Sequence, residues 1–163
     1  MQIRDALEDD LPAILSIYNA SITTTSTWSD VEQTLEERRA WFTERQAAGD
    51  AVLVADDGGV VGFAAYGPFR DNELWPGYRF TVELTVHVHH DRQGARIGEA
   101  LMVELADRAR TAGKHVMIAA VDSENTGALR FYRRLGYVET GRLPQTGRKF
   151  DRWLDLVFLQ VVL

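Results

Sequence analysis

The chain contains no cysteine among its 163 residues. This absence excludes disulfide bonds, thiolate metal sites and a cysteine nucleophile, and it suits a reducing compartment. No apolar run approaches the ~20 residues that a membrane-spanning helix requires. The first five residues also lack the charged-then-apolar pattern of a signal peptide. We therefore expect a cytoplasmic protein that does not enter a membrane.

Positive charge is scarce as well. The chain has 18 lysine and arginine residues against 24 aspartate and glutamate residues, a formal net charge of -6, and its basic residues are scattered. Non-specific binding of nucleic acid needs a concentrated basic surface, so we expect no nucleic-acid partner. A small phosphate-bearing cofactor remains compatible with this charge, because a local loop can bind phosphate through backbone N–H groups.

Candidate metal ligands are few. The chain has 4 histidines, and His87 and His89 would share one face of a strand because side chains alternate. No carboxylate or further histidine stands at the spacing of a metal-binding motif, so we expect no metal site. A Gly-x-Ser-x-Gly elbow is also missing, which disfavours a Ser-His-Asp hydrolase.

The composition that is present is that of a globular protein. Hydrophobic residues make up 45% and charged residues 26% of the chain, and the length fits one domain over residues 1–163. The expected strands are residues 3–6, 51–55, 60–66, 81–88, 116–121, 137–141 and 153–163. The expected helices follow a cap at Asp9 or Asp10, run from a cap at Asp30 to Gly49, and cover residues 97–112 and 126–135. This order predicts an α+β fold in which a mixed, mostly antiparallel sheet carries helices on both faces.

The most informative segment is a strand, a turn and a helix. A strand ending in Val86-His87-Val88 runs into a polar turn, and a helix follows at once. Gly94 and Gly98 allow this turn to point backbone N–H groups outward, and the helix dipole adds positive potential there. Such a turn binds phosphate, but by itself it is as often a plain structural connection.

A second pattern covers Asn125 to Tyr137 and reads Asn-Thr-Gly-Ala-Leu-Arg-Phe-Tyr-Arg-Arg-Leu-Gly-Tyr. Ala128 and Tyr132 are four residues apart and share one helix face, and Asn125 is placed to bond backbone or ligand. Taken alone, the pattern equally describes an ordinary amphipathic helix with Tyr132 in the core and a Gly136 C-cap.

Together the two segments resemble the GNAT acetyltransferases. In that family the cofactor turn follows Gln/Arg-x-x-Gly-x-Gly/Ala, and the later helix carries Asn-x-x-Ala-x-x-x-Tyr-x-x-x-Gly-Phe/Tyr. More narrowly, the chain looks like the phosphinothricin and methionine sulfoximine N-acetyltransferases. The shared stretches are Ile17-Tyr18-Asn19, Trp28, Thr81-Val82-Glu83, His115-Val116-Met117 and Gly147-Arg148-Lys149-Phe150-Asp151-Arg152-Trp153.

This resemblance implies a GNAT fold with splayed central strands and an acetyl-CoA co-substrate. It also implies transfer of acetyl to the free amine of a small amino-acid-like molecule, and a homodimer with residues 154–163 as a candidate contact. The backbone of Val86, His87 and Val88 would pair with the pantetheine arm, and Asn125 would assist. The turn would take the pyrophosphate through Gln93, Gly94, Ala95, Arg96, Ile97 and Gly98.

Glu83 is the candidate general base. It interrupts an otherwise apolar strand, residues 82–86, where a lone carboxylate is costly without a partner or a role. Burial would raise its pKa towards the range in which it accepts an ammonium proton. The alternative is that its side chain faces solvent or pairs with Arg79. By resemblance, Tyr132 would donate a proton to the departing CoA thiolate.

Substrate contacts are expected from the loop between two central strands and from the C-terminal stretch. Arg70 and Arg79 bracket that loop and suit a bidentate clamp on a carboxylate. The other candidates are Lys149 for a phosphinate or sulfoximine oxygen, the wall residues Trp28, Phe69 and Trp75, and Leu84 and Thr85 beside the base. The alternative for each is a surface cation or a core side chain.

One departure from the family pattern stands in the turn. Arg96 occupies a position where the family usually has glycine. If the backbone there has a positive φ, Arg96 adds strain, although its guanidinium would also suit a CoA phosphate.

Two other functions remain open at this point. One is a GNAT enzyme for a different amine, such as a polyamine, an antibiotic or a protein N-terminus. The other is a non-catalytic acyl-CoA sensor in which Arg96 has spoiled the turn. Such a sensor would bind acetyl-CoA without transferring its acetyl group.

Overall fold

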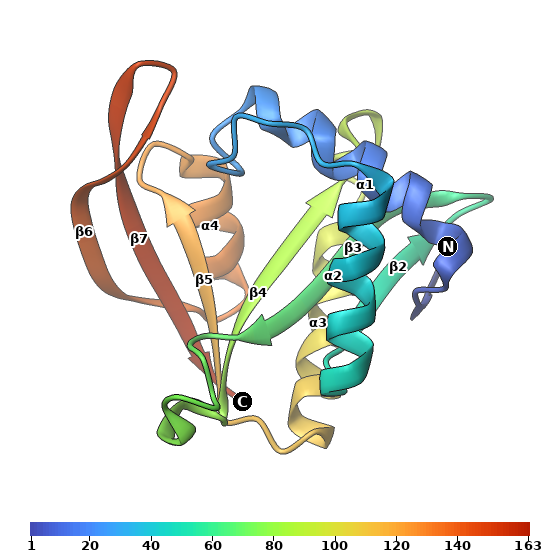
Figure 1. The fold of residues 1–163 in the computed structure, drawn as a ribbon. Helices are drawn as coiled ribbons and strands as arrows, with labels where there is room; N and C mark the ends of the chain where they lie inside the picture. Colours follow the sequence, from blue (N-terminus) through green and yellow to red (C-terminus); the bar gives the residue numbers. More distant parts are fainter.

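The computed structural model describes residues 1–163 and confirms the α+β class, with seven strands in one sheet and four helices (Figure 1). The strands are β1 (Gln2–Asp5), β2 (Val52–Asp56), β3 (Val60–Pro68), β4 (Thr81–Val88), β5 (Val116–Asp122), β6 (Val138–Lys149) and β7 (Arg152–Val162). The helices are α1 (Leu11–Ala20), α2 (Leu35–Ala48), α3 (Ile97–Thr111) and α4 (Thr126–Arg134). None of them combines the length and the apolar composition needed to cross a membrane.

The sheet has the strand order β1-β2-β3-β4-β5-β7-β6. Every neighbouring pair is antiparallel except β4 and β5, which run parallel. The long helix α3 lies between β4 and β5 in the chain, as a parallel connection requires. The mixed, mostly antiparallel sheet is therefore as expected.

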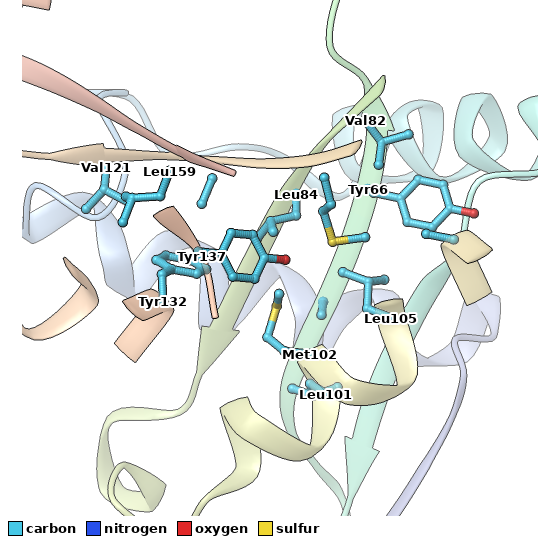
Figure 2. Packing of buried hydrophobic residues seen from close by; sticks show 14 of the residues in the cluster. Tyr66, Val82, Leu84, Leu101, Met102, Leu105, Val121, Tyr132, Tyr137 and Leu159 are labelled. Atoms are coloured by element: carbon cyan, nitrogen blue, oxygen red, sulfur yellow. The ribbon is translucent and has the colours of Figure 1, made fainter. Parts of the chain in front are cut away.

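Helices cover both faces of the sheet, and each face has its own hydrophobic core. The larger core contains Leu101 and Leu105 of α3, Tyr132 of α4, and strand residues such as Val82 and Leu84 (Figure 2). The smaller core packs α1 and α2 through residues such as Ile14 and Phe42 against Phe63 and neighbouring strand residues. Successive strand side chains therefore alternate between an α3/α4 face and an α1/α2 face.

The parallel pair β4–β5 is paired only at its start. Its register joins Thr81 to Val116, Val82 to Met117 and Glu83 to Ile118, and no further pair follows. Beyond Glu83, β4 continues against β3 and β5 continues against β7. The ends of β4 and β5 consequently diverge (Figure 1), and they leave a gap in the centre of the sheet. This gap agrees with the splayed strands that the sequence resemblance implies.

The expected cap of α2 is wrong, and that of α1 is confirmed in position only. Helix α2 begins after Thr34, whose hydroxyl accepts a hydrogen bond from the Glu37 N–H while Glu37 bonds back to the Thr34 N–H. This reciprocal capping box replaces the predicted Asp30 cap. Asp10 stands at the N-cap position of α1, but its carboxylate is held by Arg4 and by the Leu7 N–H and makes no hydrogen bond to the first turn of α1.

The expected end of β6 at residue 141 is also wrong. The strand continues to Lys149 and forms a long hairpin with β7, interrupted by register shifts between Glu139 and Gly141 and between Leu143 and Gly147. Bulges of this kind absorb glycine and proline in an edge strand. The other elements lie within a few residues of their predicted bounds.

Candidate active site

The gap between β4 and β5 exposes one edge of β4. The Phe69 N–H donates to the Thr81 carbonyl at 3.3 Å, and the His89 N–H donates to the Val61 carbonyl at 2.9 Å. Odd-numbered residues of β4 therefore turn their backbone polar groups to β3. Even-numbered residues turn theirs to the opposite edge, where no strand lies beyond Glu83.

Val86 and Val88 are the residues whose backbone groups lie on this open edge. Each offers an N–H and a carbonyl to an extended ligand, as in β-strand addition. The register does not support the expected backbone role of His87, which is paired with Phe63. The His87 ring stacks on Phe63 at 5.3 Å, and burial lowers its pKa to about 4, so the ring is neutral.

The turn before α3 supplies a row of free donors. The backbone N–H groups of residues 94–99 donate to no backbone carbonyl. This stretch includes Gly94, Ala95, Arg96, Ile97 and Gly98, and Gln93 stands exposed just before it. The first turn of a helix adds positive potential at the same place. The arrangement fits a pyrophosphate without any net positive charge on the protein.

Arg96 has the positive φ that its position in the turn suggested. Its backbone has φ 58° and ψ 16°, the left-handed region, directly before the first residue of α3. Its side chain makes no capping hydrogen bond. An L-residue with a Cβ is strained there, whereas glycine is not.

We expect Arg96→Gly to raise the free energy of unfolding by about 1 kcal/mol, because it relieves this strain. Arg96→Ala is the matched control, since it removes the guanidinium but keeps the Cβ. Urea denaturation of the three proteins measures the effect. Equal stability of the glycine and alanine variants would show that the left-handed backbone carries no strain.

Glu83 stands at the fork where β4 and β5 separate. It is the last β4 residue that pairs with β5, opposite Ile118. Val82 and Leu84 lie in the α3/α4 core, so the Glu83 side chain points to the α1/α2 face. Burial raises the pKa of its carboxyl group above the ordinary value of 4.5, and no cation offsets that burial. Arg79, the alternative partner, donates instead to the Pro76 carbonyl at 2.9 Å.

Tyr132 approaches the gap from the other face. It is 7% exposed, and its ring lies 5.3 Å from that of Tyr137 in the α3/α4 core (Figure 2). Burial raises the pKa of its hydroxyl, so this group stays protonated and is able to donate. Asn125 lies just before α4, where its side chain accepts a hydrogen bond from the Ala128 N–H at 3.0 Å. It therefore acts as the helix cap.

The predicted clamp residues lie on the loop between β3 and β4. Arg70 and Arg79 are both exposed, and their guanidinium groups stand over aromatic rings, 5.4 Å from Phe69 and 4.3 Å from Phe80 respectively. The Phe69 ring in turn makes an edge contact with Phe158 of β7 at 6.2 Å. Phe69 is therefore placed as a wall beside the sheet, while Trp75 is 49% exposed.

The remaining predicted substrate residues lie on different faces. Thr85 shares the α1/α2 face with Glu83, because the two are separated by one residue. Leu84 belongs to the α3/α4 core, so only its backbone borders the gap. Trp28 packs against Gly147 of β6. Lys149 is 1% exposed, with its ammonium hydrogen-bonded to two backbone carbonyls.

Two further residues on the Glu83 face were not expected from the sequence. Ala120 pairs with Phe158 but is exposed in mid-strand, on the β5 side of the gap. Asp122 is 3% exposed, and its Oδ2 has no hydrogen-bond partner. An exposed alanine inside an otherwise buried strand indicates that the sheet face is uncovered at that point. The sequence alone does not show this exposure, because it depends on how the strands pair.

The histidines form a small surface group that strand alternation did not predict. His89, His90 and Asp91 bring one potential ligand atom each within 4.8 Å of one another. His90 and Asp91 are exposed, and His90 Nε2 lies 3.1 Å from Asp91 Oδ1. His87 does not join them, since its ring is buried against Phe63. The absence of a metal site remains a prediction.

Comparison with known proteins identifies the family of the chain. Residues 11–137 match the model of the acetyltransferase (GNAT) family. The chain is 46% identical over 162 residues to the L-methionine sulfoximine/L-methionine sulfone acetyltransferase of Pseudomonas aeruginosa, covering 98% of this chain and 92% of that one.

Solved structures have the same fold over essentially the whole chain. The ribosomal-protein-alanine N-acetyltransferase of Brucella melitensis superimposes with a TM-score of 0.96 at 42% identity, covering 100% of both chains. The phosphinothricin acetyltransferase of Sinorhizobium meliloti, in complex with acetyl-CoA, superimposes with a TM-score of 0.94 at 32% identity. That match covers 99% of this chain and 88% of the other. The chain therefore belongs to the GNAT family and is an N-acetyltransferase.

Proposed function

We propose that the protein transfers acetyl from acetyl-CoA to the amine of a small amino acid whose side chain ends in a polar sulfur or phosphorus group. The Pseudomonas aeruginosa relative carries methionine sulfoximine and methionine sulfone in its name, and the Sinorhizobium meliloti structure contains acetyl-CoA. We further propose that residues 1–163 act as one catalytic domain, in a cytoplasmic homodimer.

The observation that carries this proposal is the position of Glu83 at the fork. Its side chain is half-buried with no cation to offset this, and its pKa is raised, so its carboxylate is a stronger base than a fully exposed one. It lies beside the open edge of β4, which suits an extended ligand. The free N–H groups of residues 94–99 stand at the far end of that edge and fit the pyrophosphate of CoA.

The proposed base and the proposed acid act from opposite faces of the sheet. Acetyl-CoA supplies the thioester that an amine attacks. Glu83, on the α1/α2 face, accepts the ammonium proton directly or through water and so produces the neutral amine. The Val86 or Val88 N–H on the open edge donates to the carbonyl oxygen as it gains negative charge. Tyr132, on the α3/α4 face, donates its proton to the departing thiolate, and the second proton that the amine loses as the amide forms balances the proton that Tyr132 gives up.

We expect Tyr132→Phe to lower kcat by about tenfold, with the KM of acetyl-CoA little changed. A thiolate is already a good leaving group, so general-acid assistance contributes less than the roughly 10²–10⁴-fold typical of general acid–base catalysis. The variant also keeps the ring that packs against Tyr137. Steady-state kinetics measure this, and an unchanged kcat would exclude Tyr132 as the acid.

The experiment that tests the function is CoA release from acetyl-CoA in the presence of a panel of amines. The candidate substrates are methionine sulfoximine, methionine sulfone and phosphinothricin. The comparison amines are methionine, a polyamine and a peptide with an N-terminal alanine. The peptide is included because the Brucella melitensis structure is that of a ribosomal-protein-alanine N-acetyltransferase. We expect the highest kcat/KM with the first three amino acids. A higher value for the peptide would move the substrate class to protein N-termini.

A further inference from the structure

We infer that Lys149 positions the wall of the substrate pocket and does not itself contact the substrate. Its ammonium holds the segment of residues 24–28, between α1 and α2, against strand β6, and this contact places Trp28. The inference rests on the proposed function. It replaces the expectation that Lys149 binds a phosphinate or sulfoximine oxygen.

The Lys149 ammonium is occupied by the protein itself. Its Nζ donates to the Thr24 carbonyl and to the Thr27 carbonyl, each at 2.6 Å. The residue is 1% exposed, and burial lowers the pKa of its ammonium. A buried ammonium has to be hydrogen-bonded to remain charged. Two of its three N–H donors bond to these carbonyls, which lie outside the helices and strands.

A second contact joins the same two segments. Gly147 lies two residues before Lys149, so the two residues present the same face of β6. A Cβ built on Gly147 would stand 2.3 Å from Trp28 Cε3, so the indole rests directly on the Gly147 backbone. Lys149 and Gly147 together fix both the backbone of residues 24–28 and the indole at their end.

The segment that they fix lies on the same side of the sheet as Glu83. It follows α1, which packs on this face, and extends towards β6 and β7 (Figure 1). On the same face, Ala120 is paired with Phe158, and Phe158 contacts Phe69. Trp28 and the Phe69–Phe158 pair therefore lie on the Glu83 face, and we assign them as aromatic walls of the substrate pocket. In this assignment, movement of residues 24–28 would displace the wall that Trp28 forms.

The test compares two variants that loosen the segment by different means. Lys149→Met removes the ammonium at similar side-chain length, and Gly147→Ala pushes the indole away. For each, we expect the amino-acid KM to rise about tenfold, as the loss of a buried hydrogen-bonded contact implies. The KM of acetyl-CoA and kcat should change by less than about twofold. The double variant should be no worse than the more impaired single variant, because both act on one contact.

Direct contact predicts a different pattern across substrates. If Lys149 bound a side-chain oxygen, Lys149→Met would impair phosphinothricin, whose phosphinate is charged, far more than methionine sulfone, which is neutral. Positioning predicts a similar loss for both. A loss confined to phosphinothricin, or no change in KM for any substrate, would overturn the inference.

Hydrogen exchange provides a readout that does not depend on activity. Residues 21–30 should exchange faster in Lys149→Met than in the native protein. They should be unaffected in the control Arg39→Met, which removes an exposed arginine paired with Glu8 on the outer surface. Unchanged exchange in Lys149→Met would overturn the positioning role. Absence of turnover in the native protein would contradict the proposed function alone.

Discussion

Replacing Glu83 by glutamine is expected to lower kcat/KM by about 10²–10³-fold, within the range typical of losing a general base. The amide keeps the size of the side chain but cannot accept the ammonium proton. Because burial raises the pKa of Glu83 above 4.5, activity should fall on the acid side at a pH above that value. The pH profile of kcat/KM measures this limb, and Glu83→Gln should remove it. A variant that retains full activity would exclude Glu83 as the base.

The same substitution should stabilise the protein at neutral pH. Glu83 has a folded-state pKa raised by burial, so ionisation costs folding free energy. The cost is absent below the ordinary pKa of 4.5 that applies to the unfolded chain, and it grows as the pH rises through the folded pKa. Glutamine carries no such cost. Thermal unfolding at pH 4 and pH 8 should therefore separate the two proteins only at the higher pH, and equal midpoints at pH 8 would contradict the burial of an unpaired carboxylate.

Replacing Gly98 by valine is expected to raise the KM of acetyl-CoA by more than about tenfold. A Cβ at this position would stand 3.3 Å from the Phe131 ring and 3.7 Å from Val88 Cγ2. The branched methyls of valine would need more room still, so the start of α3 has to move away from β4. Overpacking of this kind costs about 1–3 kcal/mol, and here it displaces the N–H groups assigned to the pyrophosphate.

Gly77→Val is the matched control for Gly98→Val. Gly77 has no atom within 4 Å of a built Cβ, and it lies in the loop between β3 and β4. Isothermal titration with CoA measures the affinity of both variants without any need for turnover. Equal affinities would show that the turn before α3 does not hold the cofactor.

Elements defined by short-range patterns were predictable from the sequence. The strands predicted over residues 51–55, 60–66 and 81–88 agree closely with β2, β3 and β4. The full length of β6 is not predictable from its own residues, because Gly141, Pro144 and Gly147 resemble a break between strands. Pairing with β7 overrides this local preference by two register shifts. Such tertiary pairing leaves little signal in the segment itself.

In the candidate site, too, features set by neighbouring residues were predictable, and features set by residues distant in the sequence were not. Glu83 is detectable as a lone carboxylate in an apolar strand, and the positive φ of Arg96 follows from the glycine usually found at that position. The hydrogen bonds of the Lys149 ammonium to the Thr24 and Thr27 carbonyls are not predictable from the sequence, because these partners are more than a hundred residues away. The opening at Ala120 depends likewise on where β4 and β5 cease to pair.

The most direct test of the account is the identity of the product. Purified protein, acetyl-CoA and methionine sulfone are incubated together, and mass spectrometry with fragmentation locates any added acetyl group. We predict N-acetylmethionine sulfone, acetylated on its α-nitrogen and formed in equal amount to free CoA. CoA release accompanied only by free acetate, or binding of acetyl-CoA with no acetylated product from any amine of the panel, would contradict the account.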